Sequence, residues 1–153
     1  MAGMNPSHSE PVALPEAMRQ SLWAAARAAQ QRAYAPYSHY AVGAAIVDEH
    51  GAIHAGCNVE NAAYPQGWCA EASALSALVM SGARQARGLL VLGSGGAWIT
   101  PCGGCRQKLR EFAEGDMPIV SANLQALGPI YSLEQLLPHS FGPAHLQQPL
   151  QHL

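Results

Sequence analysis

Two short segments of the chain, Cys69-Ala70-Glu71 and Pro101-Cys102-Gly103-Gly104-Cys105, hold three of its four cysteines. A catalytic zinc ion takes three protein ligands and keeps a fourth position for water or substrate. Cys102 and Cys105 are three positions apart, so both side chains can face one point, and Cys69 must approach from a different helix. Glu71 is not needed as a ligand, and its position beside a ligand suits a group that moves protons.

Both segments place a cysteine at the start of a predicted helix. The N-terminus of a helix carries roughly half a positive charge and free N–H groups. Both features favour the thiolate over the thiol. We therefore expect two helix N-termini to converge on one zinc ion.

Other interpretations of the same cysteines stay open at this point. A Cys-x-x-Cys pair can be a redox pair or half of a structural zinc site, and Cys57 could be a fourth ligand that closes the site. Against this, Cys57 falls in a predicted strand, and a buried free cysteine commonly behaves as a small hydrophobe. Glu71 could also be a solvated helix residue.

The order of predicted elements sets the fold class. Helical spacing of apolar residues, strand patterns, and Gly and Pro breaks predict helices at 15–34, 69–81, 105–113 and 133–137, and strands at 40–47, 52–57, 88–92, 118–122 and 127–131. Elements in this order predict a mixed sheet with helices packed on its faces.

Length and composition limit the class of protein. The 153 residues suit one domain, which we place at 15–153 after a flexible N-terminal tail at 1–14. A net charge of -2 gives no basic field for nucleic acid, and no apolar run approaches the roughly 20 residues of a membrane span. Four cysteines without an export signal indicate the cytoplasm.

Together these segments resemble the cytidine and deoxycytidylate deaminase family, in its compact, homotetrameric, three-cysteine form. The likeness extends to residues 34–45, 56–65 and 140–143 and covers roughly 17–147. It implies a three-layer α/β/α fold with a mixed five-stranded sheet, and one Zn²⁺ per subunit. It also implies hydrolytic deamination of cytidine and deoxycytidine to the uridines and ammonia, through attack of zinc-bound hydroxide at C4.

The resemblance also implies roles for individual residues. It makes Cys69, Cys102 and Cys105 the zinc ligands and Glu71 the proton shuttle. It implies that Asn58 and Glu60 bind the ribose hydroxyls and that the backbone N–H of Ala70 binds the pyrimidine carbonyl. It also implies that Tyr40 contacts the nucleoside, and that Tyr64 and Phe141 reach the site from a neighbouring subunit. The implied partners are a pyrimidine nucleoside and three further copies of the chain.

The chain departs from the family pattern around the metal. Ala72 and Ser73 stand where the family usually has Arg-Thr, so a cation beside the cysteine sulfurs is missing. Trp68 and Gln66 replace usual aliphatic residues. Alternative functions are an aminohydrolase for N4-modified cytidines or a cytosine nucleoside antibiotic, and a zinc-stabilised binding module without activity. Uridine formation would separate these alternatives.

Overall fold

The computed structural model describes residues 9–147. In chain order the elements are α1 (Glu16–Gln30), β1 (Val42–Asp48), β2 (Ile53–Cys57), η1 (Tyr64–Gln66), α2 (Ala70–Met80), β3 (Ala86–Gly93), α3 (Gly103–Phe112), β4 (Pro118–Ala122), β5 (Leu127–Ser132), α4 (Leu133–Leu136) and α5 (Pro143–Leu146). Every predicted helix and strand is present, and most of the ends differ by one or two residues. The short helices η1 and α5 were not predicted.

The largest error of boundary is at the end of the first helix. It stops at Gln30 rather than at Tyr34, because Tyr34 pairs with a distant loop instead. The backbone N–H of Tyr34 donates to the carbonyl of Asn58 at 3.0 Å, and the N–H of Glu60 donates to the carbonyl of Tyr34 at 2.8 Å. This pairing outweighs the helical propensity of the preceding Ala-rich sequence.

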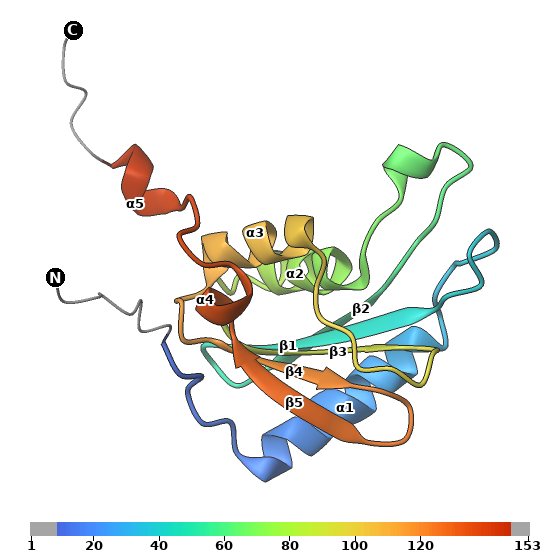
Figure 1. Ribbon diagram of the computed structural model, residues 1–153, viewed down its shortest axis with the longest axis horizontal. Helices are drawn as coiled ribbons and strands as arrows, with labels where there is room; N and C mark the ends of the chain where they lie inside the picture. Colours follow the sequence, from blue (N-terminus) through green and yellow to red (C-terminus); the bar gives the residue numbers. More distant parts are fainter. Residues whose placement is uncertain (1–8, 148–153) are drawn as a thin grey trace, which may run out of the picture.

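The five strands form one mixed sheet in the order β2-β1-β3-β4-β5 (Figure 1). Strands β3 and β4 run parallel, and the other neighbouring pairs are antiparallel. The predicted mixed five-stranded sheet is confirmed. The parallel pair is joined by a crossover through α3, which carries Cys102 at its N-cap.

Helices cover both faces of the sheet: α1 lies on one face, and α2 and α3 lie on the other (Figure 1). Successive residues of β1 therefore enter opposite cores, with Ala44 and Ile46 facing α2 and α3 and Ala45 and Val47 facing α1. Burial on both faces explains why the central strands are continuous apolar runs. The three-layer α/β/α architecture is confirmed.

Close packing of α2 on the sheet depends on Gly56 of β2. A Cβ added there would stand 2.3 Å from the backbone nitrogen of Ala74 and 2.6 Å from the carbonyl oxygen of Ala70. On the opposite face, a Cβ on Gly43 would stand 2.0 Å from the carbonyl oxygen of Ala26. The two glycines let the backbones approach directly, and Gly56 thereby sets the position of the N-terminal turn of α2.

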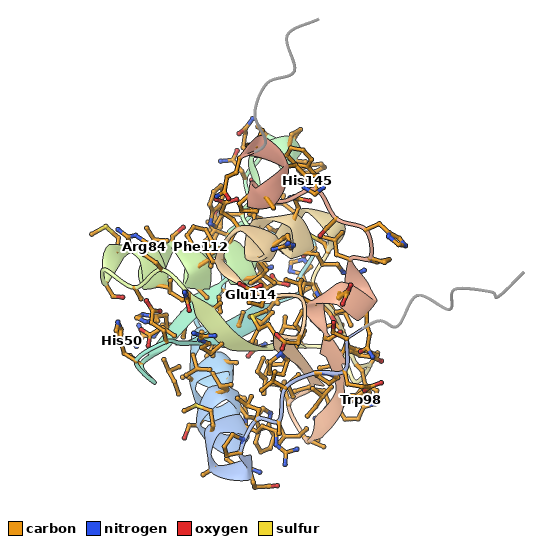
Figure 2. The ribbon with its side chains drawn as sticks, turned by 90° about the vertical axis from the view of Figure 1, so that its left-hand side faces the viewer. His50, Arg84, Trp98, Phe112, Glu114 and His145 are labelled. Carbon is orange, nitrogen blue, oxygen red and sulfur yellow. The ribbon has the colours of Figure 1, made fainter. Side chains whose placement is uncertain are left out.

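Two aromatic side chains pack against the sheet and its core. Phe112 on α3 packs against the core between α2, α3 and the sheet, and is labelled in Figure 2. Trp98, on the loop before α3, packs over Gly128 of β5, where an added Cβ would stand 2.6 Å from the indole ring. The loop that leads to the Pro101–Cys105 segment is thus held against the sheet.

Residues 9–14 are in contact with the domain, although the sequence predicts a flexible tail over 1–14. The backbone N–H of Val12 donates to the carbonyl of Asp116 at 2.9 Å, and Leu14 packs against the core on the α1 side, close to Gly88. These contacts fix the second half of the predicted tail, and residues 1–8 lie outside the described residues. Within residues 9–147, no helix has the length and apolarity that crossing a membrane requires.

Candidate active site

Three cysteine sulfurs meet where α2 and α3 begin. Cys69 is the N-cap of α2, Cys102 is the N-cap of α3, and Cys105 lies in the first turn of α3. The three sulfurs all lie within 4.8 Å of one another, and those of Cys69 and Cys102 are 3.9 Å apart. The structure therefore brings together the three cysteines that the sequence singles out.

This cluster fits a zinc ion. Tetrahedral coordination with Zn–S bonds of about 2.3 Å places neighbouring sulfurs about 3.8 Å apart, close to the distance between Cys69 and Cys102. Thiolate sulfur is also a ligand that zinc prefers. The arrangement needs no large movement of either helix to hold the metal.

Cys57 does not belong to the cluster. Among the described residues, the metal-ligating group consists of Cys69, Cys102 and Cys105 alone. Cys57 ends β2, is half-buried, and its carbonyl accepts a hydrogen bond from the Ser73 hydroxyl at 2.9 Å. A three-cysteine set is the pattern of a zinc site that keeps a position for water or substrate, rather than of a closed structural site.

The pKa values of the three thiols shift in different directions. Burial raises the pKa of Cys69 and of Cys105, and the negative charges of their neighbours raise both further. Burial also acts to raise the pKa of Cys102, but hydrogen bonds from the Cys105 backbone and from neighbouring sulfurs outweigh it, so that pKa is lowered. The stabilisation of the thiolate that we expected from the helix N-termini is therefore dominant only at Cys102. A bound divalent cation would hold all three cysteines as thiolates.

Glu71 is buried beside the cluster, with 6% of its surface exposed. Burial raises the pKa of its carboxyl group, while a hydrogen bond with the Cys105 side chain and the positive charge of Lys108 act in the opposite direction. A buried carboxylate with a raised pKa is a stronger proton acceptor than an exposed one, which suits a group that accepts and releases a proton. The alternative of a solvated helix residue is wrong.

A cavity of about 420 Å³ joins this cluster to the loop between β2 and α2. It is lined by Val42, Asn58, Val59, Glu60, Tyr64, Gly67, Trp68, Cys69, Ala70, Glu71, Ile99, Thr100 and Cys102. Sequence reasoning missed Ile99 and Thr100, and the signal for them was their place directly before Pro101. The cavity therefore has a metal-binding end and a polar end.

Asn58 stands at the polar end with a fixed side chain. Its Oδ1 accepts from the N–H of Val42 at 2.8 Å, and its Nδ2 donates to the carbonyl of Tyr40 at 2.9 Å. An amide has two donor hydrogens and two acceptor lone pairs, so one of each is left after these contacts. Asn58 can therefore both donate to and accept from a ligand in the cavity.

Glu60 is held by the loop before β1. Its carboxylate accepts from the backbone N–H of Tyr37 at 2.8 Å, and from both the N–H and the hydroxyl of Ser38. The Ser38 hydroxyl is the strongest of the contacts that lower the pKa of Glu60. An ionised carboxylate with unused lone pairs accepts hydrogen bonds from hydroxyl groups.

Ala70 lines the cavity, whereas Tyr40 does not. Ala70 is the first residue of α2, so its N–H has no acceptor within the helix and is available at the cavity wall. Tyr40 is not among the lining residues. Its ring lies over Gly93, where an added Cβ would stand 2.3 Å from the Tyr40 hydroxyl, and its carbonyl supports Asn58.

The two aromatic residues expected to act across a subunit interface are both exposed. Tyr64 is 74% exposed, lines the cavity from η1, and makes an edge contact with Tyr37 at 5.7 Å between ring centroids. Phe141 is 58% exposed, stacks on His145, and does not line the cavity of its own chain. A role for Phe141 in a neighbouring subunit stays a prediction.

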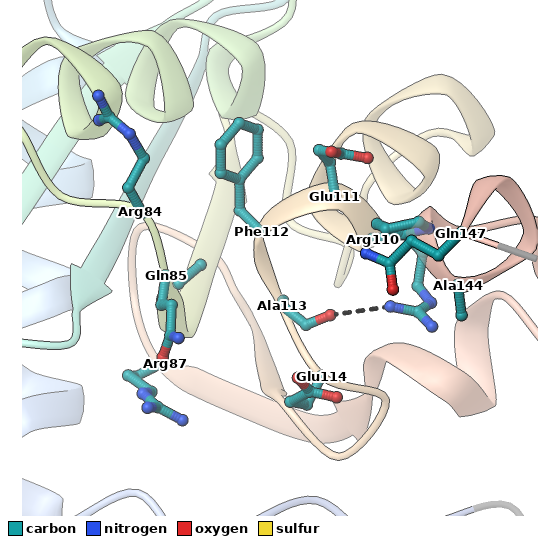
Figure 3. Close-up of a pocket in the computed structure, with 12 residues that line it drawn as sticks. Arg84, Gln85, Arg87, Arg110, Glu111, Phe112, Ala113, Glu114, Ala144 and Gln147 are labelled. Carbon is teal, nitrogen blue, oxygen red and sulfur yellow. Dashed lines mark hydrogen bonds between the residues drawn. The ribbon is translucent and has the colours of Figure 1, made fainter.

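A second cavity of about 370 Å³ lies at the opposite end of α3 (Figure 3). Arginines and glutamates of mixed charge line it, and Arg110 donates to the Ala113 carbonyl at 3.3 Å across one side. It is lined by none of the three clustered cysteines. The chemistry of the cysteines and Glu71 therefore belongs to the first cavity.

Comparison with known proteins agrees with this geometry. The family model described as "Cytidine and deoxycytidylate deaminase zinc-binding region" matches residues 15–121. The chain belongs to the cytidine and deoxycytidylate deaminase family. A cytidine deaminase of Sporosarcina psychrophila is 39% identical over 127 residues, covering 83% of this chain and 93% of its own.

Solved structures show the same family likeness. The crystal structure of cytidine deaminase from Burkholderia pseudomallei matches with a TM-score of 0.76 at 40% identity, covering 80% of this chain and 98% of its own. Cytidine deaminase from Mycobacterium tuberculosis matches with a TM-score of 0.72 at 35% identity, covering 82% and 98%. The deaminase domain and the three-cysteine cluster together support one zinc ion per subunit.

Proposed function

We propose that this member of the deaminase family converts cytidine and deoxycytidine to uridine and deoxyuridine, with release of ammonia. The observation that carries the proposal is the buried carboxyl of Glu71, which lies beside the three-cysteine cluster and lines the same cavity as Asn58 and Glu60. The cavity thus offers proton transfer at one end and recognition of hydroxyl groups at the other. Such an activity would serve pyrimidine salvage.

The residues of the chain divide the work as follows. Bound at Cys69, Cys102 and Cys105, zinc supplies activation of water near neutral pH. Glu71 accepts one proton from the attacking water and delivers it to ring nitrogen N3, and the second proton of the same water then passes through Glu71 to the departing amine. Water oxygen replaces the amino group at C4, so the products are a uridine and ammonia.

The remaining polar groups orient the nucleoside. We propose that the N–H of Ala70 donates to the pyrimidine carbonyl, and that Asn58 and Glu60 bind the ribose hydroxyls. We propose Tyr64 and Phe141 as contacts made across subunit boundaries. For Tyr40 we propose an indirect contribution, because its carbonyl fixes Asn58 while its ring lies over Gly93.

A substrate panel tests this function. The zinc-loaded protein is incubated with cytidine, deoxycytidine, N4-substituted cytidines and free cytosine, and the products are followed by ultraviolet absorbance and an ammonia assay. We expect turnover of both nucleosides and little turnover of free cytosine, which lacks the sugar. Turnover of N4-substituted cytidines alone would favour the alternative of an aminohydrolase for modified nucleosides, and no turnover at all would favour a zinc-stabilised binding module.

We also propose a homotetramer in the cytoplasm. Helix α2 presents Ser76, Ala77 and Met80 at the surface, and Met80 is 87% exposed. Beside it an apolar groove runs between α2 and α3, and Trp68, 49% exposed, lies at its start. Small and apolar residues on an exposed helix face suit packing against a second copy of the helix.

Two other predictions have their own tests. Cell fractionation tests the proposed cytoplasmic location, and limited proteolysis tests the predicted start of the domain at residue 15.

A further inference from the structure

Lys108 is the only lysine of the chain, and it lies on α3 one turn beyond the metal-binding cysteines. Long side chains on a helix point back toward its N-terminus. The Nζ of Lys108 accordingly lies 3.7 Å from the point where a Cβ on Gly104 would stand, and the sulfur of Cys102 lies 4.0 Å from the same point. The ammonium group and the sulfur therefore flank one glycine in the first turn of α3.

Lys108 also lies next to the first turn of α2. It lines a groove of about 480 Å³ together with Trp68 and Ala72, the residues on either side of the Cys69–Glu71 segment. The short side chain of Ala72 leaves this part of the groove to the lysine. The single ammonium group thus stands beside both helix N-termini that carry cysteine.

The other cations near α3 are committed elsewhere. Arg106 donates to the carbonyl oxygens of Pro101 and Leu136, both at 2.7 Å, and to the hydroxyl of Thr100 at 2.9 Å. Within residues 9–147, by contrast, the ammonium group of Lys108 makes no hydrogen bond or ion pair, and its positive charge acts on Glu71, beside the cysteine cluster. Its charge is therefore available to the metal centre.

The metal centre has an excess of negative charge that a neighbouring cation would offset. Three thiolates and Zn²⁺ sum to a charge of -1, with no cationic side chain at residue 72. We propose that Lys108 is a positioning residue of the metal centre, whose ammonium group stabilises the three-thiolate zinc site electrostatically and supplies the positive charge absent from residue 72. This inference rests on the zinc site of the proposed function but not on its substrate.

Zinc release tests the proposal without reference to turnover. Zinc-loaded wild type, Lys108→Gln, Lys108→Arg and Arg87→Gln are mixed with a chromogenic zinc chelator, after light scattering and melting curves have established equal mass and folding. Arg87→Gln is the matched control, because Arg87 is exposed and lines the second cavity at the far end of α3. We expect Lys108→Gln to lose zinc about threefold to tenfold faster than wild type, Lys108→Arg to stay within about twofold, and Arg87→Gln to be unchanged.

Two further measurements separate charge from packing. Raising the salt concentration to roughly 0.5 M should reduce the difference in zinc-release rate between Lys108→Gln and wild type, because salt screens the interaction between exposed charges. The double variant Lys108→Gln/Ala72→Arg should release zinc more slowly than Lys108→Gln, because residue 72 lines the same groove. If Lys108→Gln keeps zinc as wild type does, if Lys108→Arg is as fast as Lys108→Gln, or if salt leaves the difference in zinc-release rate unchanged, the proposal is overturned.

The two hypotheses fail in different ways. Turnover of cytidine is measured on the same zinc-loaded samples. Absence of turnover with zinc retained would sink the proposed function and leave the role of Lys108 standing on the release rates. Normal turnover with equal release rates in all variants would sink the role of Lys108 alone.

Discussion

The sulfur of Cys69 lies 3.9 Å from the sulfur of Cys102, although the two residues are 33 positions apart in the chain. Each is the N-cap of its own helix, and the two helices lie on the same face of the sheet. The metal centre is therefore a product of how α2 and α3 pack on the sheet. It follows that changes in the sheet can disturb the centre without touching a ligand.

The first prediction distinguishes the ligand cysteines from Cys57. Cys105→Ser should reduce bound zinc well below one ion per chain, because the serine hydroxyl is a poorer zinc ligand than thiolate. Cys57→Ser is the control and should keep one zinc ion per chain, since Cys57 lies outside the cluster. Metal analysis of the purified variants measures the zinc bound per chain. Loss of zinc in Cys57→Ser to the same extent would mean that the site is a closed four-cysteine site.

The second prediction concerns the contact between β2 and α2. Gly56→Ala should lower the free energy of unfolding by about 1–3 kcal/mol, since the added methyl group would collide with the backbone of α2 at Ala74. Gly96→Ala is the control, because nothing lies within 4 Å of a Cβ added there. Urea unfolding monitored by circular dichroism measures both. Equal stability of the two variants would show that α2 does not need this close approach.

The third prediction concerns acid stability. The side chain of Asp48 is buried and bonded to Nε2 of His54 at 2.7 Å, and it accepts the N–H groups of His50 and Ala52. The His54 hydrogen bond is the main reason that folding lowers the pKa of Asp48. A carboxyl whose pKa is lowered on folding stabilises the folded state above its unfolded pKa of about 3.9, and this contribution is lost as the pH falls further.

Comparison of wild type with Asp48→Asn measures this contribution, because the effect of acid on zinc binding is common to both proteins. The difference in their unfolding free energies should be largest near neutral pH and shrink from about pH 5 to about pH 3. Urea unfolding of both proteins at several pH values measures this difference as a function of pH. A difference that stays constant over this range would mean that the Asp48–His54 contact does not depend on the charge of Asp48.

The fourth prediction concerns assembly. Ser76→Arg places a long charged side chain on the exposed face of α2, and should convert the proposed tetramer to smaller species in light scattering at micromolar concentration. Gln20→Arg, on the exposed face of α1, is the control and should leave the mass unchanged. A fully active monomer in the wild-type protein would refute the tetramer.

Sequence patterns located the strands and the cysteines well, for identifiable reasons. Strands buried on both faces, such as that containing Leu89 and Leu90, are continuous apolar runs, and the cysteine spacing has few alternative explanations. The end of α1 was misplaced because the pairing of Tyr34 with Asn58 is a non-local contact. No local pattern reports such a contact.

Electrostatic detail was the least predictable part of the site. Helix N-termini led us to expect stabilised thiolates throughout, yet burial raises the pKa of Cys69 and Cys105. The sequence also gave no reason to connect Lys108 with Ala72, because their proximity depends on how α2 and α3 pack. The small helix α5 did have a local signal, since Pro143 follows Gly142 at the first helical position.

The most direct test of the account is cytidine turnover by Glu71→Gln, measured on samples whose zinc content matches that of the wild type. Glutamine preserves the shape of the side chain but cannot accept the proton, so we expect wild-type zinc content and melting behaviour with turnover reduced by about 10²–10⁴. Glu114→Gln, an exposed residue at the far end of α3, should keep full activity. Turnover of Glu71→Gln within tenfold of wild type, with zinc bound, would contradict the assignment of Glu71 as the group that moves the proton.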